Sequence, residues 1–337
     1  MQLTDQDLLL ITGATGLVGS HLAEEARQRG LRTRAIVRAS SDTKLLDEWG
    51  VETVVGDMAD PLSLAQALAG ATVVVHCAAK VGDWGPIDEY RQVNVAGLEK
   101  LLEAAEANGS LRRFVHVSSL GVYEARDHHG TDETEPVNLA GIDGYTVTKA
   151  EADLLVQKHV AEKNLPGVIL RPGFIYGPRD RTVFPRLLER IRDKRFAYLG
   201  KGDKLVNNTY VGNLVQAIFL AIEKDEALGR VFNIRDGRLV TKKEFMEAIA
   251  DEAGYDKPTK HVNLQFAKGL AKVMEGTWRL LGKKEAPLLS SARIKFLGLN
   301  LDFSMERAQR ELGYQPATDF DAAMKTTIDW FREQGML

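Results

Sequence analysis

Cysteine is almost absent from this chain, because Cys77 is its single thiol. One thiol cannot form a disulfide within the chain, so the sequence suits a reducing compartment. No apolar run approaches the ~18 residues that a membrane-spanning helix needs. Residues 1–5 carry an acid where a secretion signal would carry basic residues. We therefore expect a cytoplasmic protein without a transmembrane segment.

A large excess of charge is absent too. The chain has 44 Lys and Arg against 47 Asp and Glu, a net charge of -3, which gives no overall attraction to nucleic acid or anionic lipid. We therefore expect no nucleic-acid partner. We expect no metal site either, since His128 and His129 stand in a polar stretch without a second group of ligands, which we interpret as an exposed loop. What the 337 residues do contain is a hydrophobic fraction of 44%, enough for a large core.

Short apolar runs alternate with amphipathic segments in the first half of the chain. The apolar runs cover residues 8–12, 33–37, 51–55, 73–77, 114–118 and 168–170. The amphipathic segments cover residues 43–49, 62–68, 90–107 and 145–162. This alternation predicts an α/β fold with a doubly wound parallel sheet and right-handed crossovers.

Three glycines separate the first apolar run from the helix expected after it. Gly13, Gly16 and Gly19 are spaced three residues apart. Between a strand and a helix, such glycines allow a tight turn, leave bare backbone for a pyrophosphate, and let the helix pack closely on the strand. The free N–H groups that begin the helix would then face phosphates. The stretch predicts a dinucleotide site, which also includes Thr15, Leu17 and Val18.

The pattern changes after a segment rich in proline and glycine at residues 171–178. Mostly helical segments follow, apart from an apolar run that we expect to return to the sheet near residues 231–235. We therefore predict a dinucleotide-binding domain over residues 1–177, completed by that return strand. A smaller, mostly helical substrate-binding lobe would cover residues 178–230 and 236–337. The substrate would lie in the cleft between them.

Tyr145 and Lys149 stand one helical turn apart, so they share a helix face. A free phenol titrates at about pH 10, but a nearby ammonium lowers its pKa. The pair can then exchange a proton with a substrate oxygen while a hydride moves at carbon. The alternative is a surface pair at chance spacing. Ser118 and Ser119 end an apolar run, where ligands bind in α/β sheets, although either serine can equally be a turn residue.

Together these motifs resemble those of the extended short-chain dehydrogenases/reductases, in the NAD-dependent epimerase/dehydratase and 3β-hydroxysteroid dehydrogenase-like group. The resemblance follows family order over almost the whole chain. It implies a Rossmann fold, a nicotinamide cofactor, and a homodimer that pairs through residues 90–107 and 145–162. The matching stretches are residues 12–19, 56–58, 76–79, 94–97, 118–119, 145–149, 171–173, 176–178, 303–304 and 311–316.

The resemblance also implies a role for each matching residue. Tyr145 would be the general acid/base, and Lys149 would bind the nicotinamide ribose and lower the Tyr145 pKa. Ser119 would orient the substrate oxygen, in preference to Ser118. Asn94 would support the site and a proton-relay water, or be a structural helix residue. Further implied cofactor contacts are Asp57 and Met58 at the adenine, Ala78, Ala79 and Lys80 after the fourth strand, and Pro172 and Gly173 at the nicotinamide.

Arg38 follows the second apolar run, where relatives that use NAD usually carry an acid for the ribose 2′-hydroxyl. A guanidinium group suits an adenosine 2′-phosphate instead. We therefore predict that NADP(H) is preferred over NAD(H). The alternative is a solvated arginine at the end of a strand.

Three residues are candidates for substrate contact. Asp83 and Trp84 follow the fourth strand in a segment that resembles the steroid-dehydrogenase form, and Tyr176 lies in the proline-glycine segment. Trp84 would be either an apolar wall or a packing residue between lobes. Residues 264–281 carry a helical apolar stripe, which is core, a lid, or a helix resting on a membrane.

These observations predict an NADP(H)-dependent oxidoreductase that interconverts a secondary alcohol and a ketone on a steroid-like or lipid-like small molecule. One alternative is a nucleotide-sugar epimerase or reductase, in which arginines such as Arg179 and Arg181 would hold the diphosphate. The other alternative is a non-catalytic NADP-binding sensor.

Overall fold

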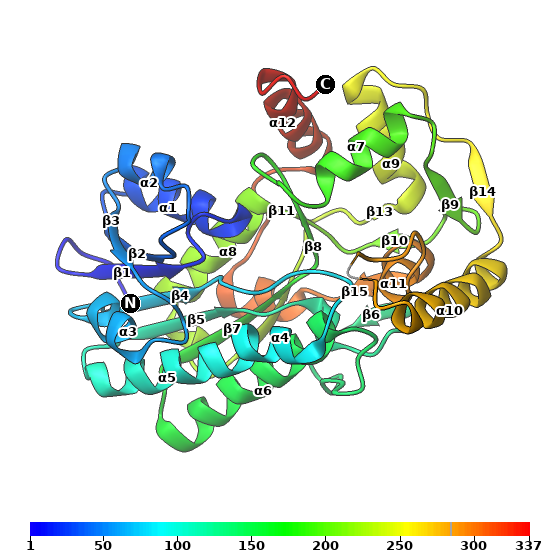
Figure 1. Cartoon of the computed structure of the whole chain (residues 1–337). Helices are drawn as coiled ribbons and strands as arrows, with labels where there is room; N and C mark the ends of the chain where they lie inside the picture. The colour runs from blue at the N-terminus through cyan, green and yellow to red at the C-terminus, as the bar shows by residue number, and fades with distance from the viewer. Residues whose placement is uncertain (284) are drawn as a thin grey trace.

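The computed structural model describes residues 1–283 and 285–337. Its centre is a parallel sheet of seven strands in the order β12-β7-β5-β4-β1-β2-β3 (Figure 1). The strand order reverses between β1 and β4, the place where such sheets bind ligands. The predicted doubly wound sheet is confirmed. Its strands are β1 Leu8–Thr12, β2 Arg32–Val37, β3 Glu52–Val55, β4 Val73–His76, β5 Arg113–Val117, β7 Gly167–Pro172 and β12 Val231–Ile234.

Helices cover both faces of this sheet (Figure 1). Side chains of β1 alternate between the faces, so Leu9 and Ile11 join one core while Leu8 and Leu10 join the other. The first core is closed by α1 Leu17–Gln28, α2 Lys44–Glu48 and α8 Val211–Glu223. The second is closed by α3 Pro61–Leu68, α5 Gly97–Asn108 and α6 Gly144–Lys163.

Helix α8 does not belong where the predicted domain division put it. Its buried side chains, Leu214 and Ile218 among them, pack in the core of the sheet together with Ala308 and Tyr314. The sheet domain therefore recruits α8 and residues 305–314, which the sequence-based division had assigned to the substrate lobe. The reason is that α1 and α2 alone leave this face of a seven-stranded sheet partly bare.

A second lobe has its own core, built from aromatic and aliphatic side chains. Its principal helices are α7 Phe184–Arg192, α9 Lys242–Ala253 and α12 Phe320–Glu333. Two further helices, α10 Leu264–Leu280 and α11 Ser291–Gly298, lie at its edge (Figure 1). Four two-stranded sheets complete it and join it to the sheet domain: β6 His128–Thr131 with β15 Leu301–Phe303, β8 Phe174–Tyr176 with β11 Asn208–Tyr210, β9 Ala197–Leu199 with β14 Lys260–Val262, and β10 Leu205–Val206 with β13 Val240–Thr241.

His128 corrects the expectation of an exposed loop. The ring is fully buried, 4.3 Å from the Phe303 ring. Its Nε2 lies 2.9 Å from the Glu124 carbonyl and its Nδ1 lies 3.0 Å from the Thr131 hydroxyl. The pairing of β6 with β15 buries it, a contact between segments about half the chain apart.

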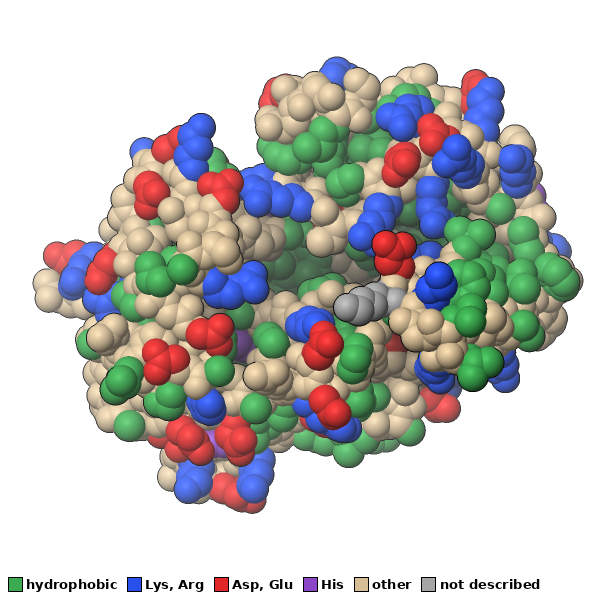
Figure 2. Space-filling model, in the orientation of Figure 1, with side chains coloured by type: hydrophobic (Ala, Val, Ile, Leu, Met, Phe, Trp, Pro, Cys, Tyr) green, Lys and Arg blue, Asp and Glu red, His purple; other side chains and the backbone are tan. Residues whose placement is uncertain are grey.

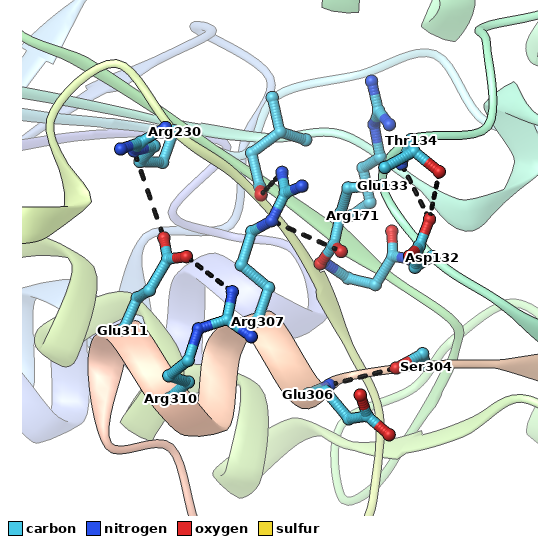
Figure 3. A network of polar contacts seen from close by, with 12 residues as sticks. Asp132, Glu133, Thr134, Arg171, Arg230, Ser304, Glu306, Arg307, Arg310 and Glu311 are labelled. Carbon is cyan, nitrogen blue, oxygen red and sulfur yellow. Dashed lines mark hydrogen bonds and ion pairs between the residues drawn. The ribbon is translucent and has the colours of Figure 1, made fainter.

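A network of ion pairs holds the return strand β12 in place (Figure 3). The buried Glu133 carboxylate accepts a 2.7 Å hydrogen bond from the Asn233 N–H and lies 3.7 Å from Arg307. Arg307 also donates to the Val231 carbonyl at 3.4 Å. Glu311 lies between Arg230 and Arg310 (Figure 3). The segment after β15 is thereby attached directly to the start of β12, and through Glu133 to Asn233 near its end.

Candidate active site

The glycine turn lies at the carboxyl end of β1 and begins α1. Gly13 has φ +71°, and a Cβ there would lie 2.8 Å from the Ala78 backbone nitrogen. At Gly19 a Cβ would lie 2.3 Å from the Gly13 carbonyl oxygen. Gly16 is exposed directly before the helix. The turn therefore presents bare backbone and unpaired N–H groups, which fits the pyrophosphate of a dinucleotide.

Neighbouring strand ends surround this turn. The Ala78 N–H donates to the Thr12 hydroxyl at 3.2 Å, so the segment after β4, which continues into Ala79, is tied to β1. A small pocket beside the turn is lined by Ala14 and Thr15 of the turn and by Arg179 and Arg181 of the loop after β8. Our sequence reasoning placed these arginines on the substrate side. The Arg179 guanidinium instead forms a 2.6 Å ion pair with Glu24 of α1.

The residues expected at the adenosine lie where β2 and β3 end. Arg38 directly follows β2 and is exposed, and within the described residues its guanidinium has no ion-pair partner. Asp57 is exposed after β3 and accepts the Ala59 N–H at 2.8 Å. Met58 packs against Gly97 at the start of α5. The end of β2, next to β1 and its glycine turn, thus carries an exposed guanidinium that could meet a phosphate on the adenosine ribose.

Ser118 and Ser119 have different surroundings. The buried Ser118 hydroxyl donates to the Asp153 carboxylate at 2.6 Å. The partly exposed Ser119 caps the short helix η2 Leu120–Val122 by accepting the Gly121 N–H at 2.9 Å. Ser119 also lowers the pKa of Tyr145 by hydrogen bonding. The structure therefore brings Ser119, and not Ser118, to the phenol.

Tyr145 is carried by the first turn of α6. Asp143 caps this helix as the sequence predicts, accepting the Thr146 N–H at 2.7 Å. Burial raises the pKa of Tyr145 to about 12, opposed by the hydrogen bond from Ser119 and assisted by the Asp143 charge. The phenol therefore keeps its proton at neutral pH in the free protein.

Lys149 is held by the end of β5 in this structure. Its ammonium donates to the Val117 carbonyl at 2.6 Å, so its effect on the Tyr145 pKa stays a prediction from the resemblance. Burial lowers the pKa of Lys149 to about 8, although Asp153 acts in the opposite direction. Desolvation thus outweighs the Ser119 hydrogen bond at Tyr145 and the Asp153 charge at Lys149.

A buried ion pair fixes the helix that carries Tyr145 and Lys149. Asp153, one turn beyond Lys149, accepts from Arg171 at 2.7 and 2.9 Å. Arg171 also donates to the Tyr123 hydroxyl at 2.8 Å, and Tyr123 donates to Asn233 at 2.9 Å. Through these contacts α6 is attached to β7, the segment after β5, and β12. Our sequence reasoning missed Asp153, although its spacing from Lys149 was a visible signal.

Asn94 lies in a π-helical turn, η1 Gln92–Ala96, that links α4 Ile87–Arg91 to α5. Its carbonyl accepts the Lys80 N–H at 2.7 Å, and its amide donates to the Lys80 carbonyl and the Thr148 hydroxyl at 3.1 and 3.0 Å. The Lys80 side chain pairs with Glu89. Asn94 therefore fastens the segment after β4 to α6, which is the structural alternative considered for it.

The candidate substrate residues divide into two kinds. Asp83 and Trp84 lie in the segment after β4 and contact the second lobe: Asp83 pairs with Arg293 at 2.9 Å, and the Trp84 indole N–H donates to the Lys283 carbonyl at 2.9 Å. Tyr176 is fully buried, and its hydroxyl donates to Asp236 at 3.1 Å. The expectation that Tyr176 faces a substrate is therefore wrong, because Asp236 and the aromatic core enclose it.

Pro172 and Gly173 lie where β7 ends. Pro172 is buried. A Cβ at Gly173 would lie 1.9 Å from the Asn207 carbonyl oxygen. The close approach of Asn207, the residue before β11, thus requires a glycine here.

Comparisons with known proteins agree with this geometry. The sequence profile of the NAD dependent epimerase/dehydratase family matches residues 9–234. A 4-hydroxy-2-methyl-3-oxo-4-farnesyl-3,4-dihydroquinoline-1-oxide ketoreductase of Stigmatella aurantiaca is 31% identical over 90% of this chain and 90% of its own. A 2-alkyl-3-oxoalkanoate reductase of Stenotrophomonas maltophilia is 31% identical over 94% of this chain and 97% of its own.

Two further comparisons extend over nearly the whole chain. A 3-beta-hydroxysteroid dehydrogenase of Mycolicibacterium neoaurum is 30% identical over 98% of this chain and 93% of its own. The crystal structure of gox2253 superposes with a TM-score of 0.83 at 29% identity, covering 98% of this chain and 99% of that one. The chain therefore belongs to the NAD-dependent epimerase/dehydratase family and is a nicotinamide-dependent oxidoreductase that acts on CH–OH groups.

Proposed function

We propose that this enzyme interconverts a secondary alcohol and a ketone on a lipid-like or steroid-like molecule and prefers NADP(H) as its coenzyme. The observation that carries the proposal is the meeting of the Ser119 and Tyr145 side chains beyond the carboxyl end of β5. Their hydroxyls lie at the sheet edge that also holds the glycine turn. A carbonyl oxygen can be bound there by two donors while its carbon faces the coenzyme.

The chain's own residues would handle the proton. The bound nicotinamide supplies the hydride for reduction or accepts it for oxidation. Tyr145, whose pKa is raised to about 12 by burial, would donate a proton to the ketone oxygen. Ser119 would hold that oxygen by a hydrogen bond. Lys149, with its ammonium one turn along α6, would bind the ribose next to the nicotinamide.

Two observations favour a lipid-like substrate over a nucleotide sugar. Three relatives are named for substrates that include a hydrocarbon skeleton: a farnesyl-dihydroquinoline-1-oxide, a 2-alkyl-3-oxoalkanoate and a 3-beta-hydroxysteroid. Of the two arginines considered for a diphosphate, Arg179 is already engaged in an ion pair with Glu24. We therefore propose an apolar carbon skeleton beside the reacting carbonyl.

The coenzyme preference rests on Arg38. Its guanidinium is exposed beside the end of β2, and no acid in the described residues pairs with it. An adenosine 2′-phosphate would gain a charge-assisted contact there, whereas a bare ribose would not. Substitution of Arg38 by Asp should therefore weaken NADPH binding and strengthen NADH binding.

A homodimer and a cytoplasmic location remain proposals. Helices α5 and α6 lie side by side on the outside of the sheet (Figure 1). Val93, just before α5, and Leu154 of α6 are each 37% exposed there, which suits pairing with a second copy. Sedimentation of wild type against Leu154→Asp tests the dimer. The single thiol, Cys77, whose pKa is raised to about 12 by burial, fits a protein that uses no disulfide.

The decisive experiment compares ketone reduction by wild type and Tyr145→Phe. A panel of a 3-ketosteroid, a 2-alkyl-3-oxo acid and a UDP-sugar is assayed with NADPH and with NADH. We expect turnover of an apolar ketone with NADPH, and a loss of about 10²- to 10⁴-fold in kcat in Tyr145→Phe, the usual contribution of a general acid. The affinity of Tyr145→Phe for the coenzyme should equal that of wild type.

Tyr255→Phe, a change in the second lobe far from the glycine turn, serves as the matched control and should resemble wild type. Equal turnover by wild type and Tyr145→Phe would contradict the proton role. Activity on the UDP-sugar alone would replace the lipid-like substrate with the nucleotide-sugar alternative. Coenzyme binding without turnover of any member would favour the sensor alternative.

A further inference from the structure

Helix α10 exposes several of its large apolar side chains. Along its 17 residues only Ala267 and Ala271 are buried. By contrast, Phe266 and Val273 are 65% and 66% exposed, and the exposed stripe continues through Leu270, Leu280 and Leu281. These positions recur at helical spacing on one face. The alternative that the stripe is simply core is therefore excluded by the structure.

The same helix is locally basic in a chain whose net charge is -3. Its one acid, Glu275, is turned toward α11, where it accepts the Ser291 N–H at 2.6 Å and the Ser291 hydroxyl at 3.0 Å. Figure 2 shows hydrophobic side chains gathered over α10 at the right of the view, with basic side chains at the margin. The cations of residues 260–283 are Lys260, Lys268, Lys272, Arg279 and Lys283.

We propose that α10 is a docking helix that lies in the interface of an anionic lipid bilayer. A helix with an exposed apolar stripe and a basic polar side is the chemistry that such a surface recognises, since the stripe enters the acyl boundary while the cations meet the headgroups. A second copy of the chain fits less well, because a symmetric contact through this face would oppose like charges. No described helix is long and apolar enough to cross a membrane, so the contact would be peripheral.

The docking helix is connected to the catalytic site by direct contacts. The Lys283 carbonyl accepts from the Trp84 indole at 2.9 Å, which joins the end of α10 to the segment after β4. Next to α10, Arg293 of α11 pairs with Asp83. Lys295 of α11 donates at 3.0 Å to the carbonyl of Gly121, two residues after Ser119. A bilayer against α10 would therefore lie beside the structural elements that enclose the site.

This inference rests on the proposed function, because a lipid-like substrate gives the docked position its use. An apolar substrate dissolved in a membrane would reach the cleft from that side without crossing water. Asp83 and Trp84, which we considered as candidate substrate contacts, would then connect the docking helix to the cofactor domain.

The test is sedimentation of the full-length protein with vesicles of phosphatidylcholine mixed with phosphatidylglycerol, and with phosphatidylcholine alone. The variants are F266D/V273D for the stripe and K268E/K272E for the charge. L62D, which places an acid at an equally exposed apolar position on α3, is the control. We expect wild type and L62D to bind the mixed vesicles, and binding to fall at least about tenfold in both double variants and on pure phosphatidylcholine.

Two outcomes would overturn the proposal. One is no binding of wild type to the mixed vesicles, or unchanged binding of both double variants. The other is a wild-type dimer that F266D/V273D converts to monomer without any vesicle binding, which would assign the face to a second copy. Reduction of a water-soluble ketone should be the same in wild type and F266D/V273D. If the proposed function were wrong, Tyr145→Phe would be as active as wild type. That result would leave vesicle binding by α10 unaffected, so the two proposals can fail separately.

Discussion

Helices α1 and α10 both contain glycine, yet the glycines have opposite surroundings. Gly19 of α1 is buried, with the Gly13 carbonyl where a side chain would begin. Gly269 and Gly276 of α10 have nothing within 4 Å of that position. In α1 glycine is required by close packing against the turn that receives a dinucleotide. In α10 no close contact among the described residues requires a glycine.

The contrast extends from single residues to the two regions around them. Around α1 and α6, apolar side chains fill a core and polar side chains find buried partners such as Asp153 and Arg171. Around α10, several apolar side chains are exposed and the helix also carries Lys268, Lys272 and Arg279. Substitutions should therefore have large effects on folding and chemistry in the first region and small ones on folding in the second.

The largest expected effect is at the buried ion pair. Asp153→Asn would leave the Arg171 guanidinium buried without its counter-charge, a loss of about 3–5 kcal/mol in the free energy of unfolding. Urea denaturation measures it. The exposed pair of Asp251 with Lys257 provides the control, since Asp251→Asn should leave the unfolding curve nearly unchanged. Equal effects of the two substitutions would contradict the distinction between packed and exposed regions.

The pH dependence of the two reaction directions tests the packed region next. Because the pKa of Tyr145 is raised to about 12, the phenolate that alcohol oxidation needs is scarce at neutral pH. The oxidation rate at saturating coenzyme should rise about tenfold per pH unit between about pH 6 and about pH 8, whereas reduction, which needs the protonated phenol, should not gain. Since the pKa of Lys149 is lowered to about 8, its ammonium is lost above that pH and coenzyme affinity should fall there.

Initial rates in both directions, with coenzyme affinity measured separately by titration, provide the data. A plateau of the oxidation rate below about pH 7 would show that bound coenzyme acidifies the phenol, as the family resemblance implied for Lys149. The free-protein geometry, with Lys149 donating to Val117, would then describe only the state before coenzyme binds.

Gly19→Ala addresses the comparison of the two helices directly. The new methyl group would start 2.3 Å from the Gly13 carbonyl oxygen, so the turn has to open. We expect a loss of about 1–3 kcal/mol in the free energy of unfolding, the usual cost of overpacking, together with weaker NADPH binding. Calorimetric titration and urea denaturation measure the two effects. Unchanged coenzyme affinity would show that the turn does not hold the pyrophosphate.

The parts that the sequence predicts well are those whose signal is local. The strands from Leu8 to Val117 and the cap at Asp143 follow from runs and spacings within one element. Tyr176 was misjudged because its environment depends on Asp236, which lies 60 residues further along the chain. Asp153 on helix α6 was missed for a similar reason, since its partner Arg171 belongs to strand β7.

The stripe on α10 shows a second limit. A helical apolar pattern gives the direction in which one face points, but the same pattern suits a core helix and an exposed one. What decides between them is whether the rest of the fold covers Phe266 and Val273, and it leaves them exposed. The pKa of Tyr145 cannot be predicted from the sequence for the same reason. The spacing between Tyr145 and Lys149 is visible in the sequence, but the desolvation of the two groups is not.

The smallest effect, and of opposite sign, is expected at Gly269→Ala. This glycine sits inside an exposed helix where a methyl group meets nothing, so the substitution reduces the freedom of the unfolded chain without a clash. The free energy of unfolding should rise by about 0.5–1 kcal/mol, and vesicle binding should be that of wild type. Urea denaturation beside Gly19→Ala gives both values under one set of conditions. If Gly269→Ala destabilised the protein instead, this face of α10 would have to be packed against something in solution, and the contrast between the two helices would be lost.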